Sequence, residues 1–167
     1  QRESGNNLWR GLYSSKPIFS DFRGMAKIEA AIFDMDGLLI NSEPFWQQAE
    51  KEIFKKVDIE LTTAMCESMM GLRIDEVVQH WYDYKPWKGI SQEAICDKII
   101  QRVIHLIGEK GKLMDGAEEI LQLFTEKKLK MAVASSSNLE IIEFVLEKFD
   151  LAKHFDLVHS AQFEQYG

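Results

Sequence analysis

Cysteine is scarce in this sequence, which has only Cys66 and Cys96 among its 167 residues. Neither cysteine belongs to a C-x-x-C motif, and no histidine stands at metal-ligand spacing from either one. This argues against a disulfide framework and against a structural zinc site. We expect two buried free thiols, as in a protein of the reducing cytoplasm.

Long apolar runs are also missing. No run approaches the ~20 residues that a membrane helix needs, and residues 1–24 lack the apolar centre of a signal peptide. We therefore expect no membrane partner. The polar, patternless residues 1–24 are interpreted as an upstream extension that is disordered, before a natural start at Met25.

Basic residues are outnumbered, with 20 Lys and Arg against 27 Asp and Glu, for a formal net charge of −7. Nucleic-acid binding needs a basic face that meets the phosphates, so we expect no nucleic-acid partner. An anionic small molecule remains possible where a cation or a few basic side chains act locally. The 46% of hydrophobic and 28% of charged residues fit a soluble domain, with or without a small insert.

The sequence does contain an alternation of short apolar runs and amphipathic segments. Residues 28–34 (IEAAIFD) have the length and composition of a strand. The later part predicts a helix over 116–128, a strand over 129–138, a helix over 139–149 and a strand over 155–161. Such an order is typical of an α/β protein with a parallel sheet and right-handed crossovers.

A block of helical periodicity interrupts this alternation directly after the first strand. Apolar residues recur every four positions at Phe45, Ala49, Ile53 and Val57. Further on, Ser91 is placed to cap a longer amphipathic helix. We interpret residues 43–108 as an inserted helical cap, and residues 25–42 together with 109–167 as the core.

Two carboxylates, Asp34 and Asp36, end the first strand in the stretch AIFDMDGLLINSE, residues 31–43. Buried carboxylates cost free energy unless something pairs with them. Ligands of open parallel sheets bind beyond the carboxyl ends of the strands. Mg²⁺ takes oxygen ligands from one or two carboxylates plus substrate phosphate, and a carboxylate can also attack phosphorus. The motif therefore favours a phosphoryl-transfer site with Mg²⁺.

Two other interpretations of D-x-D-G compete with this one. A calcium-binding loop needs glycine at its sixth position and glutamate at its twelfth, whereas here Gly37 is fourth and Phe45 is twelfth. A simple turn, in which Asp and Gly are common, stays open on these residues alone.

The stretch DMDGLLINSE (34–43) resembles the first motif of the haloacid dehalogenase-like (HAD) hydrolases, D-x-D-G-x-[LIV]-x-[DN]-[ST]-E. The stretch MAVASSSN (131–138) supplies the Ser that ends the next core strand in that superfamily. The segment GLRIDEVVQHWYDYKPWKG (71–89) is similar to bacterial 2-deoxyglucose-6-phosphate phosphatases of the hexitol phosphatase B type. The resemblance covers residues 27–167. It implies an α/β fold, a HAD-like Rossmannoid parallel-sheet core with an inserted α-helical cap.

The resemblance also implies roles for the two carboxylates. Asp34 would be the nucleophile, and Asp36 would be the general acid and base. Mg²⁺ would be held by Asp34 and by the main-chain carbonyl of Asp36. Ser135 would hold phosphoryl oxygens, while Ser136 and Asn138 suit an anion because they stand at the start of a helix.

Two residues are candidates on the cap side. Glu43 lies at the hinge between core and cap. Arg73 either meets a phosphate or hydroxyl of the substrate or is a solvated charge near a helix start. The run Ser135 to Ser137 can also be interpreted as a simple helix cap. Only for Ser135 do we favour phosphate binding over that interpretation.

The implied function is that of a Mg²⁺-dependent phosphatase acting on a small-molecule sugar phosphate through an aspartyl-phosphate. A phosphoglucomutase-like enzyme shares the motif and the cap. A receiver-like phosphorylation switch also carries Asp at a strand end but has no such cap. The third and fourth motifs of the family, a Lys and an acidic pair, lie beyond the last residues of this sequence, so we expect a core that is incomplete at the C-terminus. A non-catalytic fragment is the remaining alternative, and the oligomeric state stays open.

Overall fold

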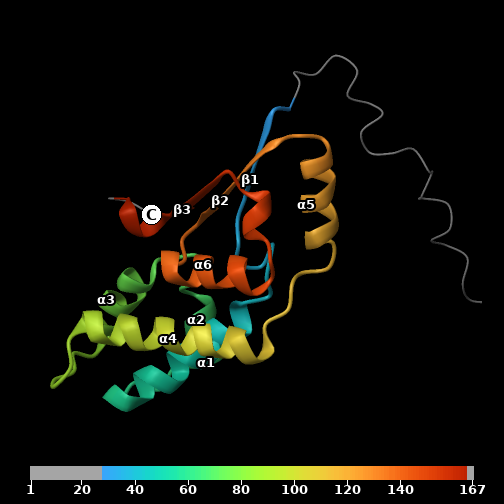
Figure 1. Cartoon of the computed structure of the whole chain (residues 1–167). Coiled ribbons are helices and arrows are strands. Elements are labelled where there is room, and N and C mark those ends of the chain that lie inside the picture. The colour runs from blue at the N-terminus through green and yellow to red at the C-terminus, as the bar shows by residue number, and fades with distance from the viewer. Residues whose placement is uncertain (1–27, 165–167) are drawn as a thin grey trace, which may run out of the picture.

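The computed structural model describes residues 28–164, and the extension expected over residues 1–24 lies outside the described residues (Figure 1). The elements are β1 (Ala30–Phe33), α1 (Glu43–Phe54), η1 (Lys55–Val57), α2 (Thr63–Glu67), α3 (Ile74–Tyr84), α4 (Gln92–Lys110), α5 (Ala117–Glu126), β2 (Lys130–Ser135), α6 (Leu139–Lys148), η2 (Ala152–His154), β3 (Leu157–Ser160) and η3 (Ala161–Phe163).

The three strands form one parallel sheet in the order β1-β2-β3. Ile32 of β1 pairs with Ala132 of β2, which in turn pairs with Leu157 of β3. The helix α6 connects β2 to β3, whereas all of α1 to α5 lies between β1 and β2 in the chain. The expected α/β class with a parallel sheet is confirmed.

The two faces of this sheet are covered unequally. On one face Phe33, Met131 and Val133 are buried, and the Phe33 ring meets the rings of Phe124 and Phe155 at centroid distances of 5.8 Å. Side chains alternate between the faces of a strand. The opposite face therefore carries Ile32, which is 75% exposed, and Leu157, which is 61% exposed.

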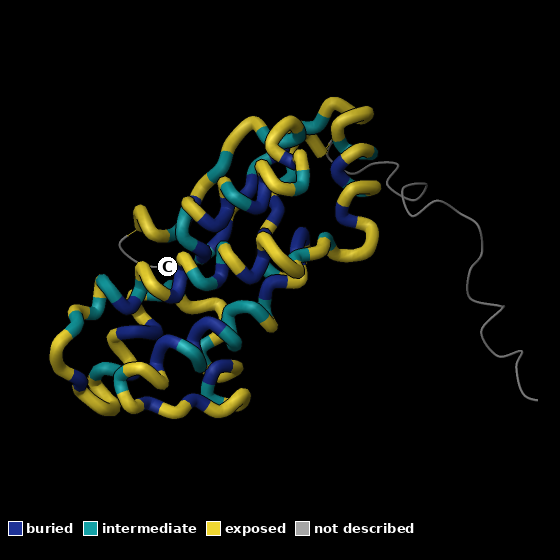
Figure 2. Tube along the Cα trace, turned by 60° about the horizontal axis from the view of Figure 1, so that its bottom comes forward, coloured by how far each residue is buried: buried dark blue, intermediate teal, exposed yellow. Residues whose placement is uncertain are grey.

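The helices α1 to α4 form a separate layer beyond the carboxyl ends of the strands (Figure 1). The longest of them, α4, begins as expected at Ser91, whose Oγ accepts a hydrogen bond from the Ala94 N–H at 3.2 Å. Its apolar stripe is fully or nearly fully buried at Ile95, Ile99, Val103 and Ile107. Figure 2 shows buried positions running through both this helical block and the sheet layer.

Two chain crossings join the helical block to the sheet layer, and they lie side by side. Ile40 forms an antiparallel bridge with Leu113. The Asn41 N–H donates to the Lys112 carbonyl at 3.3 Å, and the Met114 N–H donates to the Leu39 carbonyl at 2.9 Å. The second crossing follows α4, which runs two residues past the expected end of the cap at residue 108.

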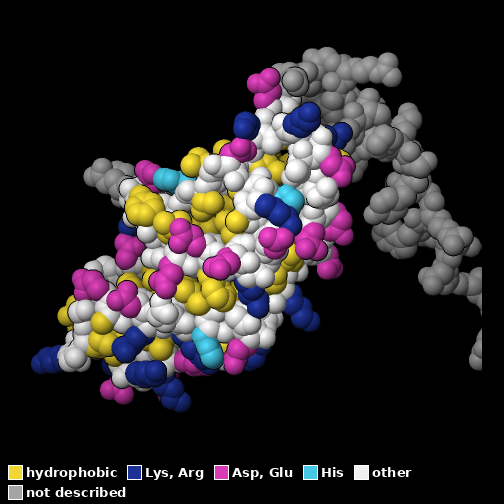
Figure 3. All heavy atoms as spheres, in the orientation of Figure 1, with side chains coloured by type: hydrophobic (Ala, Val, Ile, Leu, Met, Phe, Trp, Pro, Cys, Tyr) yellow, Lys and Arg dark blue, Asp and Glu magenta, His cyan; other side chains and the backbone are white. Residues whose placement is uncertain are grey.

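The surface is mixed in character. On the face in Figure 3, hydrophobic side chains lie among scattered acidic and basic ones. Within residues 28–164 no helix combines the length and the apolar character that a bilayer crossing requires. Both cysteines are free in the structure, Cys66 buried as expected and Cys96 only half-buried.

Candidate active site

A tight turn after β1 positions the two carboxylates of the D-x-D-G motif. Met35, between them, is fully buried, and its carbonyl accepts hydrogen bonds from the N–H groups of Leu39 and Ile40 at 2.9 and 3.2 Å. Gly37 has φ +73, a conformation that other residues rarely adopt. The turn thereby fixes Asp34 and Asp36 at the carboxyl end of the strand.

Asp36 accepts four side-chain hydrogen bonds. Its Oδ1 accepts from the Ser42 hydroxyl and from the Trp46 indole N–H, the latter at 3.2 Å. Its Oδ2 accepts from the hydroxyls of Ser135 at 3.2 Å and Ser137 at 2.7 Å. The carboxylate is thus held on both sides by donors from the end of β2 and from the start of α1.

Asp34 has a different environment, because its side chain is exposed. Its Oδ1 accepts a hydrogen bond from the Met35 N–H at 2.7 Å. Within residues 28–164 no other hydrogen bond to this carboxylate is found, so its second oxygen is available to a ligand. The pair therefore combines one immobilised carboxylate with one that faces solvent.

The residues at the serine-rich end of β2 lie in two different places. Ser135 is buried behind Asp36, and its Oγ also accepts the Ser137 N–H at 3.1 Å. Ser136, Ser137 and Asn138 line the cleft in front of the carboxylates. Asn138 uses its Oδ1 to cap α6 through the Glu140 N–H at 3.0 Å.

A cleft of about 360 Å³ lies between the strand ends and the helical block. Four carboxylates line it, namely Asp34, Asp36, Glu43 and Glu50, together with apolar side chains such as Met69, Leu72, Ile74 and Val77. No lysine or arginine occurs among the described residues of the lining. An anionic ligand here needs a cation to offset the negative lining.

This donor set suits Mg²⁺. No group of three or more His, Cys, Asp and Glu within residues 28–164 forms a complete metal cage. Mg²⁺ does not require one, because it keeps several waters and binds one or two carboxylates plus phosphate oxygens. The free oxygen of Asp34 and the main-chain carbonyl of Asp36 provide oxygen ligands of the kind it prefers.

Glu50, in the wall of the cleft, is only 7% exposed. Its Oε2 has no hydrogen-bond partner among the described residues. Burial raises the pKa of Glu50 to about 7, an effect that the neighbouring Cys66 thiol partly opposes and the Glu43 carboxylate adds to. Burial and the nearby Glu50 also raise the pKa of Cys66 to about 12, so this thiol stays protonated and is a poor nucleophile.

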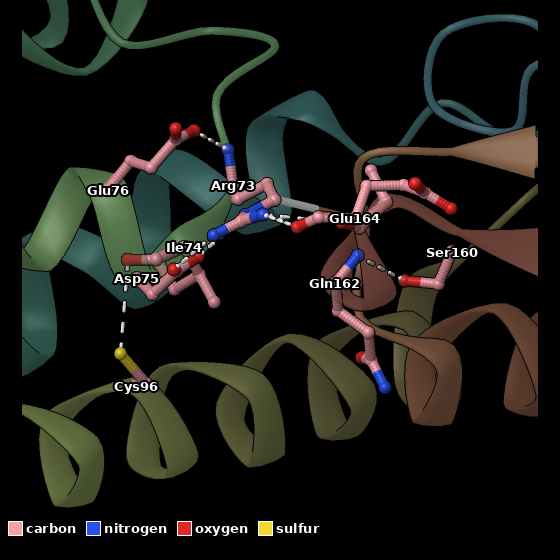
Figure 4. Close-up of polar contacts among 9 residues, drawn as sticks. Arg73, Ile74, Asp75, Glu76, Cys96, Ser160, Gln162 and Glu164 are labelled. Atoms are coloured by element: carbon pink, nitrogen blue, oxygen red, sulfur yellow. Dashed lines mark hydrogen bonds and ion pairs between the residues drawn. The ribbon is translucent and has the colours of Figure 1, made fainter. Parts of the chain in front are cut away.

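The two residues predicted on the cap side are placed differently from each other. Glu43 opens α1 and lines the cleft, where its Oε1 accepts from Gln47 Nε2 at 3.3 Å. Arg73 is not part of the cleft lining. Figure 4 shows its guanidinium between Asp75, at 2.6 Å, and the main-chain carbonyl of Glu164, at 2.7 Å. Arg73 thus ties the start of α3 to the segment after β3.

Sequence reasoning missed Ser42, Trp46, Ser137 and Glu50. Glu50 had a detectable signal, because it stands between Trp46 and Phe54 at four-residue spacing on the inward side of α1. A carboxylate on such a stripe is unusual and points to a polar cleft. The hydroxyls of Ser42 and Ser137 carried no comparable signal, because serines are common at helix starts.

Comparison with known proteins identifies the family. The model of the family described as haloacid dehalogenase-like hydrolase matches residues 31–165. Hexitol phosphatase B of Escherichia coli (strain K12) is 41% identical over 137 residues, which cover 81% of this chain and 62% of that protein. The chain thus spans less than two thirds of the length of this relative.

Solved structures share the fold. CbbY from Rhodobacter sphaeroides, in complex with phosphate, superposes with a TM-score of 0.75 at 20% identity, covering 84% of this chain and 67% of that one. A β-phosphoglucomutase from Clostridium difficile gives a TM-score of 0.73 at 23% identity, covering 84% and 65%. From the family match over most of its length, this chain belongs to the haloacid dehalogenase-like hydrolases.

Proposed function

We propose that the protein to which this chain belongs is a Mg²⁺-dependent phosphoric monoester hydrolase acting on sugar phosphates such as 2-deoxyglucose-6-phosphate. The observation that carries the proposal is the pair of carboxylates at the end of β1, one exposed with a free oxygen and one held by four donors. Membership of the family and the 41% identity to hexitol phosphatase B support it.

In this proposal Asp34 is the nucleophile. Its free carboxylate oxygen attacks phosphorus, the bond from phosphorus to the sugar oxygen breaks, and an aspartyl-phosphate forms. Water then attacks the phosphorus of this intermediate, which releases phosphate and restores the Asp34 carboxylate. The exposure of Asp34 at the cleft supports this role, because an attacking group must reach its substrate.

Asp36 is the general acid and base of the proposed reaction. It donates a proton to the departing sugar oxygen in the first step and takes one from the attacking water in the second. Its hydrogen bonds from Ser42, Trp46, Ser135 and Ser137 hold the carboxylate in place. These four donors fill its acceptor sites, so one serine hydroxyl turns away when Asp36 carries the proton. Ser135 acts in this scheme partly by orienting Asp36.

The phosphoryl group is proposed to lie against Ser136 and Asn138 at the start of α6, where the positive end of the helix favours an anion. The N–H groups of Leu139 and Glu140 already donate to the side chains of Gln162 and Asn138. Mg²⁺, when bound by Asp34 and the carbonyl of Asp36, neutralises charge on the phosphoryl oxygens. The helices over residues 43–108 form the cap that shields the cleft from water, with Glu43 at the hinge. Arg73 remains a predicted substrate contact, which requires it to leave Asp75.

A phosphoglucomutase-like reaction is the second candidate, favoured by the structural similarity to a β-phosphoglucomutase. It would use the same aspartyl-phosphate, with a sugar hydroxyl in place of water as the acceptor. Product analysis distinguishes the two reactions. A hydrolase releases inorganic phosphate, whereas a mutase yields an isomeric sugar phosphate.

Replacing the nucleophile tests the proposal. Asp34→Asn in the full-length protein keeps the size of the side chain but removes its charge, so turnover of phosphomonoesters should be abolished while the fold stays intact. Asp115→Asn, at an exposed position outside the cleft, is the matched control. Turnover by Asp34→Asn within tenfold of the unmodified enzyme would remove Asp34 from this role.

Chelation tests the metal. Treatment with EDTA should eliminate turnover, and added Mg²⁺ should restore it, because the part of the cleft lining that the structure describes carries no lysine or arginine that offsets the charge of the phosphate. Full activity in the presence of EDTA would contradict the metal requirement and leave the carboxylate assignments to be tested separately.

A further inference from the structure

We propose that Glu50 forms a polar subsite that binds a hydroxyl group of the substrate, remote from the phosphate. The inference rests on the proposed function, because it assumes that the phosphate lies at Asp34. It identifies the preferred substrates as polyhydroxylated phosphate monoesters whose far end is uncharged.

The position of Glu50 follows from the geometry of α1. Trp46, which donates to Asp36, and Glu50 are four residues apart and therefore lie on the same face of the helix. Four residues correspond to a rise of about 6 Å along the helix axis. Glu50 thus stands about one helical turn from Trp46, in the wall of the cleft that the carboxylate pair also lines.

The hydrogen bonding of Glu50 is incomplete. Its Oε2 has no partner among the described residues although the residue is 93% buried, with 7% exposure. A buried polar atom without a partner costs free energy. Such a cost is common where a side chain serves function rather than stability. Because Glu50 lines the cleft, a turn of its carboxyl group would bring this oxygen to a substrate hydroxyl, which would provide the missing partner.

The charge around Glu50 limits what can bind there. The cleft lining carries four carboxylates and, in the described part, no lysine or arginine. A second phosphate or a carboxylate on the substrate would be repelled at this place. A substrate hydroxyl can bind to Glu50 in either protonation state of its side chain. The carboxylate form accepts a hydrogen bond from the hydroxyl, and the carboxylic acid form can also donate a hydrogen bond to it.

The size of the cleft and the pKa of Glu50 are consistent with this ligand. The volume of about 360 Å³ lies within the range of roughly 300–1,000 Å³ that is typical of small-molecule sites. With a pKa of about 7, Glu50 exists in both forms near neutral pH. Neighbouring charged groups are Glu43 and Lys51 on α1, while Cys66 of α2 contributes a protonated thiol.

The test compares Glu50→Met, which removes hydrogen bonding at similar volume, with Glu50→Gln, which retains it. In the full-length protein, Glu50→Met should lower kcat/KM for 2-deoxyglucose-6-phosphate by about 10- to 100-fold. It should leave kcat/KM for ethyl phosphate, which has no hydroxyl, within about twofold. Glu50→Gln should recover part of the loss.

Glu52→Met is the matched control, since Glu52 lies on the same helix, pairs with Arg102 at 2.7 Å and does not line the cleft. It should leave the ratio between the two substrates unchanged. The melting temperature of Glu50→Met should be unchanged or higher, because the variant removes a buried carboxyl oxygen that has no partner among the described residues. Equal losses for both substrates, or a lower melting temperature with an unchanged ratio, would overturn the subsite.

A binding measurement separates this inference from the proposed function. In the Asp34→Asn background, calorimetry should show that Glu50→Met weakens binding of 2-deoxyglucose-6-phosphate by about 10- to 100-fold and leaves inorganic phosphate unaffected. Failure of the unmodified protein to hydrolyse either monoester would refute the hydrolase. Equal affinity of Asp34→Asn and of the double variant Asp34→Asn/Glu50→Met for the sugar phosphate would refute the subsite. No measurable binding by either protein would refute it as well.

Discussion

At the scale of single residues, Asp36 and Asp34 differ in how many hydrogen bonds hold them. The two oxygens of Asp36 accept hydrogen bonds from four residues on two segments of the chain, the start of α1 and the end of β2. The neighbouring Asp34 accepts only the Met35 N–H within the described residues. The two carboxylates of one short motif are therefore prepared for different tasks, one immobilised and one accessible.

Replacement of Asp36 by Asn should separate proton transfer from positioning. The amide has the same shape. Its oxygen can accept from Ser42 and Trp46, and its N–H groups can donate to the hydroxyl oxygens of Ser135 and Ser137 once these hydroxyls turn, so the fold should persist. Positioned proton transfer typically contributes ~10²–10⁴-fold, and turnover should fall by about that amount. The loss should be larger for a sugar phosphate than for nitrophenyl phosphate, whose leaving group needs less protonation. Equal losses for the two substrates would argue against an acid role.

Glu50 should make the stability of the protein depend on pH. Its pKa rises from the usual 4.5 to about 7 on folding, so between these values the folded protein keeps a proton that the unfolded chain loses. The stabilisation is complete below pH 4.5 and is lost as pH rises through 7, by at most about 3 kcal/mol. Urea denaturation at pH 5 and pH 8 measures it.

Glu50→Gln serves as the reference for that measurement because it does not titrate. The free energy of unfolding of the unmodified protein should fall relative to that of Glu50→Gln between pH 5 and pH 8. This comparison removes the contribution of groups common to both, including Asp75, whose pKa the Arg73 guanidinium lowers. A difference that stays constant over this range would show that Glu50 titrates normally.

At the scale of elements, side-chain caps determine where several helices begin. The hydroxyls of Thr62 and Ser91 accept main-chain N–H groups at the starts of α2 and α4, and the Asn138 side chain does the same for α6. Each cap satisfies a donor that has no partner within the helix. The α4 cap matters most for the helical block, because α4 packs against both α1 and α3.

Ser91→Ala should therefore destabilise the helical block. Loss of the hydrogen bond from the Ala94 N–H should lower the free energy of unfolding by about 1 kcal/mol. Ser91→Asp, which offers an equivalent acceptor, should restore most of that loss. Chemical denaturation followed by far-ultraviolet circular dichroism provides the measurement, and equal stability of the alanine and aspartate variants would contradict the capping role.

At the scale of the whole molecule, the uneven covering of the sheet has a physical consequence. Ile32, Ala132 and Leu157 lie abreast on neighbouring strands, and the first and last of them are 75% and 61% exposed. Exposed apolar surface on a sheet whose edge strand has unpaired main-chain groups favours association. In residues 28–164, β1 is such an edge strand.

We expect the 167-residue chain to self-associate through this row, and Ile32→Thr to reduce the association. The substitution should change the free energy of unfolding by no more than about 0.5 kcal/mol, because the side chain is largely exposed. Met114→Thr, at an exposed position outside the sheet, is the control. Sedimentation velocity reports the result, and identical association of the two variants would exclude the row as the contact.

The sequence by itself determined the class of fold and the order of its elements. Apolar runs of strand length, four-residue periodicity and a capping serine are local signals, and β1, β2, β3 and α4 lie where those signals placed them. The D-x-D-G motif and the serine at the end of β2 likewise pointed to the family that the comparisons confirm. These features can be predicted from the sequence because they depend on residues that are close together in the chain.

Only the tertiary structure decided which partners the side chains of the site bond to and which of these side chains are buried. The hydroxyl of Ser137 bonds Asp36 across 101 residues of sequence, while Ser135 lies buried behind the same carboxylate. Arg73 pairs with Asp75 and Glu164 outside the cleft, and Glu50 lies buried in the cleft wall with no partner for Oε2 in residues 28–164. Hydrogen-bond partners and burial depend on which distant segments meet when the strands and the helical block pack together, and no local pattern in the chain encodes that.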